Sequence, residues 1–591
     1  MIRKLIPTLL VATTMLFASA ASAAQKPNVI IVVTDDQGYG DLSCHGNPVL
    51  ETPNIDKLHG ESVRLTDYHV APTCSPTRAA LITGHWTNRT GVWHTIMGRS
   101  MLRANEVTIG QIFKDGGYAT AMIGKWHLGD NYPYRPEDRG FTWVYRHGGG
   151  GVGQTPDYWD NAYFDGSYWF NGKPVPARGF CTDVFFGQAM KFMEQQRKAK
   201  KPFLVYLCSN APHGPMHSPP QNSAPYKSLG VNVANFFGMI ANIDENVGKL
   251  RNYLKGSGLD ENTILIFTTD NGSSSGSKVF NDGMRGAKGS EYEGGHRVPL
   301  FIKWPKGDLG GGRDVKTITS YVDVVPTLID LCEVPAPKGV KFDGVSLKPL
   351  LYGTAKNWPD RILVTDSQRV RDPIKWRKSA VMTSQWRYNN GKELYDIKAD
   401  PGQRYNVADK NPKVVSRLRG FYEDWWTELE PSFKLTTEIY LGHPKANPVR
   451  MTCHDWISDG TTPWNQQHIR SLVTNKSATG FWAVKVITSG EYEVELRRWP
   501  KTLDKPIAAA IPAGAEVPGT QAYRARPGKA FPAVKAHLKI GGAEQTVAVP
   551  EGATNVKLKV NLKPGNDELW GKFSDAKGNE CGAYYAYVTK L

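Results

Sequence analysis

Three apolar runs rich in β-branched residues, each ending in polar residues, dominate the hydrophobic pattern of the first half of the chain. They cover residues 28–34, 203–207 and 263–269. Runs of this kind are typical of strands that are buried on both faces of a parallel sheet. Between them, the spacing of apolar residues predicts helices over 184–196 and 234–254. The alternation predicts an α/β core in which helices cover both faces of a mostly parallel sheet.

The pattern changes twice toward the C-terminus. From about residue 361 it predicts short strands over 362–365, 380–388 and 393–395 and a helix over 412–429. After about residue 441 it predicts short strands between Gly, Pro and Asn turns, over 482–486, 492–496, 536–540, 546–549, 556–560 and 584–588. We therefore expect an α/β domain over residues 24–360, a small α+β subdomain over 361–441 that completes it, and a β-rich, β-sandwich-like domain over 442–591.

The first residues have the character of a secretory signal peptide. Arg3 and Lys4 precede an apolar run over residues 9–18, and Ala21-Ser22-Ala23 resembles a cleavage site, so residues 1–23 are expected to be removed. No other segment approaches the about 20 apolar residues that a transmembrane helix needs. These features predict an exported protein, periplasmic or secreted, with no membrane span.

Charge narrows the classes of partner only weakly. The 591 residues include 72 Lys and Arg against 56 Asp and Glu, a formal net charge of +16, which favours an anionic partner. The absence of a nucleic-acid-binding motif and of a dense basic run with interleaved aromatic residues argues against nucleic acid. A sulfated or carboxylated polysaccharide suits the charge, and a solvated basic surface is the alternative interpretation.

Polar side chains at the ends of the predicted strands form a candidate metal site. Asp35 and Asp36 follow the first strand, and Asp270 and Asn271 follow a later one. Because ligands of open α/β sheets gather beyond the carboxyl ends of the strands, these side chains are expected to meet. A lone aspartate there is more often a turn residue, but two clusters at equivalent strand ends indicate a metal. Oxygen ligands select Ca²⁺ or Mg²⁺ over zinc, and the size and flexibility of this site favour Ca²⁺.

The segment Cys74-Ser75-Pro76-Thr77-Arg78 places a cysteine beside a predicted helix. Ser75 is a good N-cap, Pro76 suits the first helical turn and Gly84 is a stop signal, so Cys74 is expected just before a short helix. Free N–H groups and the helix dipole favour anions there, so the thiol is a candidate nucleophile. A buried cysteine ahead of an ordinary helix is the alternative.

The spacing Cys-x-Pro-x-Arg closely resembles the signature of type I sulfatases, members of the alkaline phosphatase superfamily, in which a maturation enzyme oxidises the cysteine to formylglycine. Five further stretches resemble the family in order: Asp35-Asp36-Gln37-Gly38, Gly124-Lys125-Trp126-His127-Leu128-Gly129, Ala211-Pro212-His213-Gly214-Pro215, Thr269-Asp270-Asn271-Gly272, and Lys288 ahead of Glu293-Gly294-Gly295-His296-Arg297. The resemblance covers nearly everything from Asn28 to about Asn406. It implies an alkaline-phosphatase-like fold and hydrolysis of sulfate esters.

The resemblance also implies roles for individual residues. Lys125 and Lys288 would clamp the sulfate oxygens, and Arg78 would brace a hydroxyl of the hydrated formylglycine. His213 would protonate the departing oxygen, and His127 would deprotonate the other hydroxyl to expel sulfate. The metal would be held by an oxygen of modified Cys74 together with Asp35, Asp36, Asp270 and Asn271. Conversion of Cys74 would leave six cysteines, an even number that permits disulfides in an exported protein.

Features outside the motifs point to the substrate less sharply. The aromatic and basic segment 131–146 offers rings and cations for a sulfated sugar, with a well-packed loop as the alternative, and the glycine run at 148–151 is expected to be a mobile loop near the site. The stretch Arg497-Arg498-Trp499-Pro500 is similar to tails of bacterial sulfatases that act on polysaccharides. We therefore expect a sulfated glycan, such as the algal galactan carrageenan, as substrate.

Two other classes of protein stay open at this stage. One is a phosphate or phosphonate ester hydrolase of the same superfamily, because the same metal and nucleophile can attack phosphorus. The other is a secreted glycan-binding protein that has kept the fold and lost catalysis, although the presence of Lys125, His127, His213 and Lys288 speaks against it. The sugar, the position of its sulfate, endo or exo action and the oligomeric state are left open by the sequence.

Overall fold

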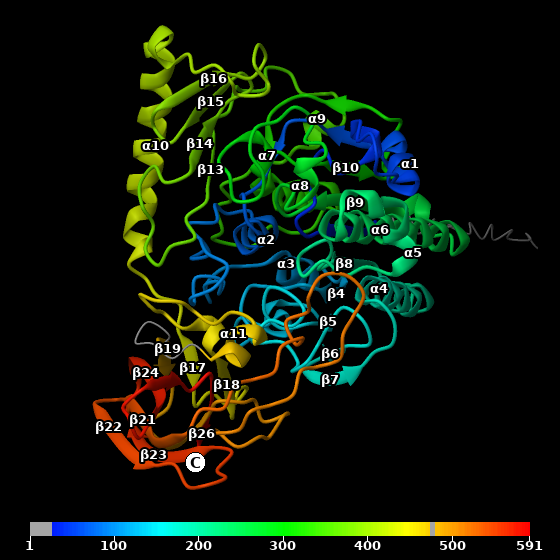
Figure 1. Cartoon of the computed structure of the whole chain (residues 1–591). Coiled ribbons are helices and arrows are strands. Elements are labelled where there is room, and N and C mark those ends of the chain that lie inside the picture. Colours follow the sequence, from blue (N-terminus) through cyan, green and yellow to red (C-terminus); the bar gives the residue numbers. More distant parts are fainter. Residues whose placement is uncertain (1–25, 473–478) are drawn as a thin grey trace, which may run out of the picture.

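A ten-stranded mixed sheet forms the centre of the fold (Figure 1). The computed structural model describes residues 26–472 and 479–591, so the predicted signal peptide lies outside the described residues. Four adjacent central strands run parallel, namely β9 (Thr263–Thr269), β1 (Asn28–Thr34), β8 (Phe203–Cys208) and β4 (Ala119–Gly124). Every residue of these strands is buried, as expected for strands covered on both faces.

Further strands, in both parallel and antiparallel pairs, extend the sheet at both edges. On one side β9 is followed by β10 (Leu300–Lys303), β2 (Val63–Leu65) and β11 (Asp314–Val315). On the other side β4 is followed by β5 (Trp143–Arg146), β6 (Ser167–Phe170) and β7 (Lys173–Pro176). A separate two-stranded sheet is formed by β3 (Tyr68–His69) and β12 (Thr319–Ser320).

Helices cover both faces of the sheet, which confirms the predicted α/β class. Ile30 and Val32 of β1 pack in a core cluster with α4 (Cys181–Lys198) and α6 (Val231–Gly256). Val29 and Val33 point to the opposite cluster, which includes residues of α2 (Cys74–Thr83), α3 (Ile109–Asp115) and α8 (Val324–Leu331). The shorter helices of this part are α1 (Pro53–Glu61), α5 (Pro220–Ser223), α7 (Glu293–His296) and α9 (Lys348–Leu351).

A four-stranded antiparallel sheet and one long helix follow the core. The strands are β13 (Leu363–Asp366), β14 (Ser379–Met382), β15 (Trp386–Asn389) and β16 (Glu393–Asp396), and the helix is α10 (Pro412–Phe433). The prediction of a single strand over residues 380–388 is wrong. A turn, in which the Thr383 N–H donates to the Trp386 carbonyl oxygen at 2.9 Å, divides this segment into β14 and β15. That turn contains neither Gly nor Pro, the residues that would have signalled it.

Two further sheets form the C-terminal part, below the core in Figure 1. One contains β17 (Ile439–Leu441), β19 (Phe481–Val486), β24 (Gly565–Asp575), β21 (Ala533–Ile540), β22 (Ala543–Ala548) and β25 (Glu580–Gly582). The other contains β18 (Val449–Thr452), β26 (Tyr585–Lys590), β20 (Gly490–Arg497) and β23 (Val556–Leu562), and α11 (Gln466–Ser471) lies between β18 and β19 in the chain. The central strand β24 was not predicted, because polar residues occupy most of its length.

The C-terminal part reaches back to the core. The loop that follows β20, orange in Figure 1, extends toward the strands of the central sheet, and the Thr520 N–H donates to the Met216 carbonyl oxygen at 2.9 Å. The Thr155 N–H donates to the Trp464 carbonyl oxygen at 3.0 Å. These contacts bring C-terminal residues next to the loops that follow β5 and β8.

All seven cysteines are free thiols in the structure, so the six besides Cys74 form none of the disulfides that their even number permitted. Within residues 26–472 and 479–591, we find no helix with the length and apolar character needed to cross a membrane.

A buried ion network ties the small sheet to the core. Arg387 of β15 binds Glu293 through Nε at 2.7 Å and Asp67 through Nη2 at 2.8 Å, with its side chain fully buried. Replacement of Arg387 by methionine is expected to destabilise the protein by about 3–5 kcal/mol, because it leaves buried carboxylates without a partner. Equilibrium unfolding in denaturant measures the loss. Arg417→Met, at an exposed pair with Asp360, is the control and is expected to cost about 0–1 kcal/mol.

The same network makes stability depend on pH. Burial alone would raise the pKa of the Glu293 carboxyl, yet the Arg387 guanidinium holds that pKa below its usual value of 4.5. The stabilisation by the Arg387–Glu293 pair is therefore complete above pH 4.5 and is lost as the pH falls. Burial lowers the pKa of His296 from 6.5 to about 3, so this histidine also favours unfolding as the pH falls below 6.5. Unfolding free energies that decline no more steeply toward low pH in the wild type than in Arg387→Met would contradict this assignment.

Candidate active site

The carboxyl ends of the four central strands bring the sequence motifs together. Asp35 and Asp36 follow β1, and Asp270 and Asn271 follow β9. One ligand atom each from Asp35, Asp36, Asp270 and Cys74 lies within 4.8 Å of the other three. Lys125 and His127 follow β4, and His213 follows β8. Lys288 comes from the loop before α7. The structure therefore gathers all ten residues that the sequence indicated, Arg78 included, at one edge of the sheet.

Cys74 lies at the start of α2, against the carboxylates. Its Sγ is 3.5 Å from Asp35 Oδ1 and 3.9 Å from Asp36 Oδ1. The helix begins two residues earlier than predicted, with Thr73 rather than Ser75 at the N-cap and Cys74 as the first helical residue, and it ends at Gly84 with φ +73° as expected. Burial raises the pKa of the Cys74 thiol to about 12, so the unmodified side chain is a poor nucleophile.

The residues present fit a hard divalent cation. Asn271 Nδ2 donates to Asp36 Oδ1 at 3.0 Å, whereas Asn271 Oδ1 is buried and has no hydrogen-bond donor. Burial and the neighbouring Asp270 carboxylate raise the pKa of Asp35 to about 8. An unpaired buried amide oxygen and carboxylates that repel one another are what a bound cation would satisfy, and an all-oxygen set suits Ca²⁺ or Mg²⁺.

Two lysines flank the carboxylates. Lys125 Nζ is 2.6 Å from Asp35 Oδ2, with both side chains fully buried. Lys288 Nζ is 2.6 Å from Asp36 Oδ1. Burial lowers the pKa of both lysines, but the Asp35 carboxylate outweighs it and holds the pKa of Lys125 above its usual value. The Asp36 carboxylate does the same for the pKa of Lys288. Both lysines are therefore cations beside Cys74, and each ammonium has donors left for a further anion.

Arg78 acts on two other site residues. Its Nε and Nη2 donate to Asp270 Oδ2 at 2.9 and 2.7 Å, and its Nη1 donates to the carbonyl oxygen of Lys125 at 3.0 Å. The guanidinium is completely buried. These contacts fix the positions of Asp270 and of the backbone at Lys125, which makes Arg78 a positioning residue in this structure.

The two histidines present different nitrogens to the site. His213 Nδ1 is 2.7 Å from the Gly214 carbonyl oxygen and donates to it, so Nε2 is free and lies 4.0 Å from Asp36 Oδ2. His127 is reversed, because its Nε2 donates to the Thr95 carbonyl oxygen at 2.8 Å and its buried Nδ1 has no partner. Burial, with a smaller contribution from the positive charge of Lys288, lowers the pKa of His213 to about 3. Burial also lowers the pKa of His127.

His127 has a strained backbone conformation, and its ring packs against Gly150. Its φ is +61°, in the left-handed region that costs a non-glycine residue of order 1–3 kcal/mol. A Cβ at Gly150 would lie 2.2 Å from His127 Cε1, so only glycine fits there. The glycine run at 148–151 is thus close to the site as expected, and its residues are buried.

A cavity of about 80 Å³ opens above Cys74. Besides Cys74, His127, His213 and Lys288, it is lined by five residues that the sequence did not indicate: Thr95, Ile96, Gln154, Arg369 and Trp464. Thr95 and Ile96 share one loop, the other three come from separate loops, and Trp464 belongs to the C-terminal part. None of them lies in a recognisable motif, so no sequence signal was available for them.

The aromatic and basic segment 131–146 packs inside the protein, so the well-packed loop is the correct interpretation for most of it. Arg139 donates to the backbone carbonyl oxygens of residues 102, 103, 104 and 106. Arg146 is paired with Asp130, and Tyr134 is 1% exposed. These three side chains do not face the cavity.

The fold and the site together define an ester hydrolase of the alkaline phosphatase superfamily. A model of the sulfatase family matches residues 27–334, and a model described as N-sulphoglucosamine sulphohydrolase, C-terminal, matches residues 287–420. The chain belongs to the sulfatase family and is a type I sulfuric ester hydrolase.

Relatives and solved structures agree with this assignment. Human arylsulfatase A is 30% identical over 460 residues, which span 68% of this chain and 88% of the relative. The uncharacterized sulfatase YdeN of Escherichia coli K12 is 28% identical over 499 residues, or 69% of this chain and 87% of the relative. The crystal structure of Ps i-CgsB in complex with k-i-k-neocarrahexaose superposes with a TM-score of 0.62 at 27% identity, covering 68% of this chain and 93% of that chain.

Proposed function

We propose that the protein is an exported, formylglycine-dependent sulfatase that removes sulfate from a sulfated galactan of the carrageenan type. The observation that carries the mechanism is the arrangement around Cys74, where two cationic lysines and two oppositely oriented histidines surround one side chain. Export rests on the signal peptide predicted over residues 1–23, and N-terminal sequencing of the exported protein is expected to begin at Ala24. A first residue within the predicted peptide would contradict it.

Each residue has a place in the proposed reaction. Formylglycine, made from Cys74 by a maturation enzyme, supplies as its hydrate the oxygen nucleophile that displaces the sugar oxygen from sulfur. Lys125 and Lys288 bind the sulfate oxygens and stabilise the charge that develops on them. His213 donates a proton from Nε2 to the sugar oxygen as its bond to sulfur breaks. His127 then takes a proton at Nδ1, which releases sulfate and restores the aldehyde.

The free nitrogens suit these roles. His127 Nδ1 carries a lone pair, because its Nε2 proton is donated to Thr95, and its lowered pKa keeps it an acceptor at neutral pH. His213 has to be protonated to act as an acid. Its low pKa in the free protein will rise when a sulfate ester, which is an anion, binds beside it.

Asp35, Asp36, Asp270 and Asn271 would hold the cation, for which we propose Ca²⁺. When bound, the cation neutralises sulfate charge and favours ionisation of a neighbouring hydroxyl.

Asn271→Ala removes the unpaired amide oxygen and is expected to weaken the apparent affinity for Ca²⁺ by more than the about 10–100-fold that loss of an outer-shell partner costs. The measurement is reactivation of chelator-treated, matured enzyme by added Ca²⁺. Asn246→Ala is the control, since Asn246 is also buried but lies within α6, where its Nδ2 donates to Asp183 Oδ1 at 2.8 Å. Equal Ca²⁺ requirements for wild type and Asn271→Ala would contradict the ligand assignment.

The rim of the cavity supports a sugar substrate. At about 80 Å³ the cavity is smaller than the about 300–1,000 Å³ of typical ligand pockets, so we propose that it takes the sulfate group while the sugar lies against the rim. Trp464 offers a ring for the sugar to stack on, and Arg369 offers a cation for a further sulfate. Ps i-CgsB, the protein solved with a neocarrahexaose, supports a galactan rather than a small aryl ester.

Trp464→Ala is expected to raise KM for a sulfated galactan oligosaccharide about 10-fold, which corresponds to a loss of about 1.4 kcal/mol of ring contact. kcat should change little, because the ring does not touch the reacting atoms. Trp570→Ala, at a partly exposed tryptophan of β24 outside the cavity, is the matched control. An unchanged KM in Trp464→Ala would remove this residue from the substrate site.

A panel of sulfated oligosaccharides tests the substrate class. We expect release of sulfate from carrageenan-type oligosaccharides at a higher kcat/KM than from glycosaminoglycan fragments, and the reverse order would sink the galactan assignment. A parallel comparison of 4-nitrophenyl sulfate with 4-nitrophenyl phosphate tests the phosphatase alternative, for which a preference for phosphate would be the sign.

A further inference from the structure

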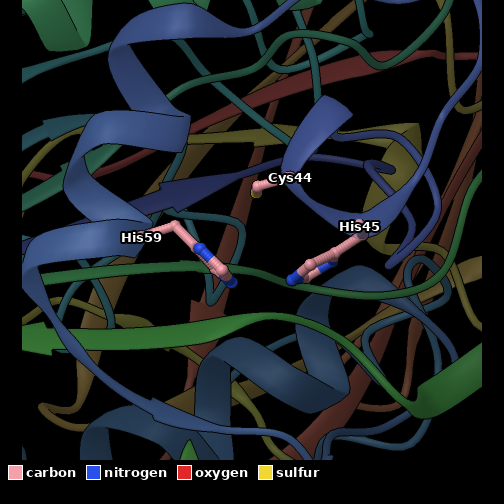
Figure 2. Close-up of side chains that lie close together, drawn as sticks. All are labelled: Cys44, His45 and His59. Atoms are coloured by element: carbon pink, nitrogen blue, oxygen red, sulfur yellow. The ribbon is translucent and has the colours of Figure 1, made fainter. Parts of the chain in front are cut away.

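A second group of metal-ligating side chains lies outside the active site. Cys44 and His45 belong to the 3-10 helix η1 (Ser43–His45), and His59 belongs to α1. One ligand atom from each of the three lies within 4.8 Å of the other two. Figure 2 shows the imidazole rings of His45 and His59 pointing toward each other, with the Cys44 side chain beside them. All three residues are half-buried, so an ion can reach them from solvent.

The two elements that carry the ligands are held together by Asp56 of α1. Its Oδ1 accepts a hydrogen bond from the Cys44 N–H at 3.0 Å, and its Oδ2 accepts one from Ser43 Oγ at 2.6 Å. The Ser43 N–H also donates to Thr52 Oγ1 at 3.0 Å. The group is therefore preorganised, and little rearrangement is needed to bring its atoms onto one ion.

His45 has the second contact that is usual for a metal-bound histidine. Its Nδ1 lies 2.8 Å from the Tyr39 carbonyl oxygen and donates to it, which leaves the lone pair on Nε2. The Tyr39 ring stacks on the imidazole at 3.8 Å between centroids and fixes its plane. The Phe301 ring contacts both imidazoles edge-on, at 5.7 Å from His45 and 5.1 Å from His59, and shields one side of the group.

Arg64 would compete with a metal ion for the Nδ1 atom of His59. Its Nη1 lies 3.4 Å from His59 Nδ1, and because a guanidinium only donates, this long contact places the His59 lone pair on Nδ1. The same guanidinium is held more firmly by Asp314, at 2.6 Å from Nε. An ion that takes His59 Nδ1 therefore displaces a weak contact, while the positive charge of Arg64 stays nearby and opposes binding.

We propose that Cys44, His45 and His59 form a binding site for a thiophilic transition-metal ion, with Zn²⁺ as the ion of choice. A thiolate and two imidazoles are ligands that Zn²⁺ prefers, and three protein ligands leave a fourth, tetrahedral position for water. The set contains sulfur and nitrogen, whereas the active-site set contains oxygen, so the two sites select different ions. Bound Zn²⁺ joins η1 to α1 and stabilises the loop that follows β1. This inference does not rest on the proposed substrate or mechanism.

The test uses the matured, Ca²⁺-saturated full chain with Co²⁺ as a spectroscopic probe. Cys74 is no longer a thiol in that protein, and among the described residues no further cysteine belongs to a metal-ligating group. A sulfur-to-cobalt charge-transfer absorption at one equivalent, removed by added Zn²⁺, is the expected result. The band should be absent in Cys44→Ser, and His59→Ala should weaken binding by more than the about 10–100-fold that loss of an outer-shell partner costs. Arg64→Gln should tighten binding, because it removes the opposing charge.

Controls separate a local effect from damage to the fold. His85→Ala alters a half-buried histidine bound to Glu106 outside the group and should leave the cobalt spectrum unchanged. Hydrolysis of 4-nitrophenyl sulfate should be retained in every variant. If Cys44→Ser fails to fold, His59→Ala and Arg64→Gln carry the test. No charge-transfer band in the wild type, or the same band in Cys44→Ser, overturns the site, and displacement of Co²⁺ by Cu²⁺ but not by Zn²⁺ overturns the choice of zinc.

Discussion

Replacement of Cys74 by alanine is expected to lower kcat for sulfate ester hydrolysis by about 10⁶-fold, the scale on which a hydrolase loses activity with its nucleophile. The physical reason is that the lysines, the histidines and the carboxylates all converge on this side chain, while burial keeps the unmodified thiol protonated. Protein produced without a maturation enzyme should be nearly as inactive, although it should fold. Steady-state kinetics on 4-nitrophenyl sulfate measures both losses.

Cys332→Ala provides the matched control, since Cys332 is equally buried but is the C-cap of α8 and does not line the cavity. It should lose some stability and keep kcat. A Cys74→Ala variant that retains wild-type kcat would show that the nucleophile lies elsewhere.

His213→Ala is expected to lower kcat/KM for a sugar sulfate by about 10²–10⁴-fold, the usual contribution of a general acid. The effect on 4-nitrophenyl sulfate should be much smaller, because nitrophenolate leaves without a proton, whereas a sugar alkoxide does not. The ratio of the two losses is therefore the informative measurement. It distinguishes an acid at Nε2 from a histidine that only binds sulfate, which would affect both substrates alike.

His217→Ala is a suitable control, because His217 lies on the same loop and its Nε2 donates to the Thr520 carbonyl oxygen at 2.8 Å rather than facing the cavity. It should not show the difference between leaving groups. Equal losses on both substrates in His213→Ala would contradict the acid role.

The strands that position the site were predictable because they are buried on both faces. β1 and β9 begin and end at the predicted residues, and the polar residues after them meet because parallel strands end at the same edge of a sheet. The small sheet was less predictable, since the turn between β14 and β15 contains no Gly or Pro. β24 was missed because polar residues occupy most of its length, so its sequence lacks the apolar pattern of a central strand.

The rim of the cavity could not be predicted, since Thr95, Arg369 and Trp464 meet only through the packing of loops that are distant in the chain. The same holds for His59, which folding brings to Cys44 and His45 although no metal-binding spacing joins them. Arg78 shows a third case, in which the motif indicated the residue but not its contacts with Asp270 and the Lys125 carbonyl.

The central claim, that Cys74 is a precursor and not the working nucleophile, is tested most directly by the mass of one peptide. Trypsin releases residues 65–78 of the active protein, which contain Cys74 as their only cysteine. The account predicts a mass lower by the difference between a CH₂SH and a CHO side chain, in proportion to specific activity across preparations. Fully active protein in which this peptide carries only unmodified cysteine would contradict it.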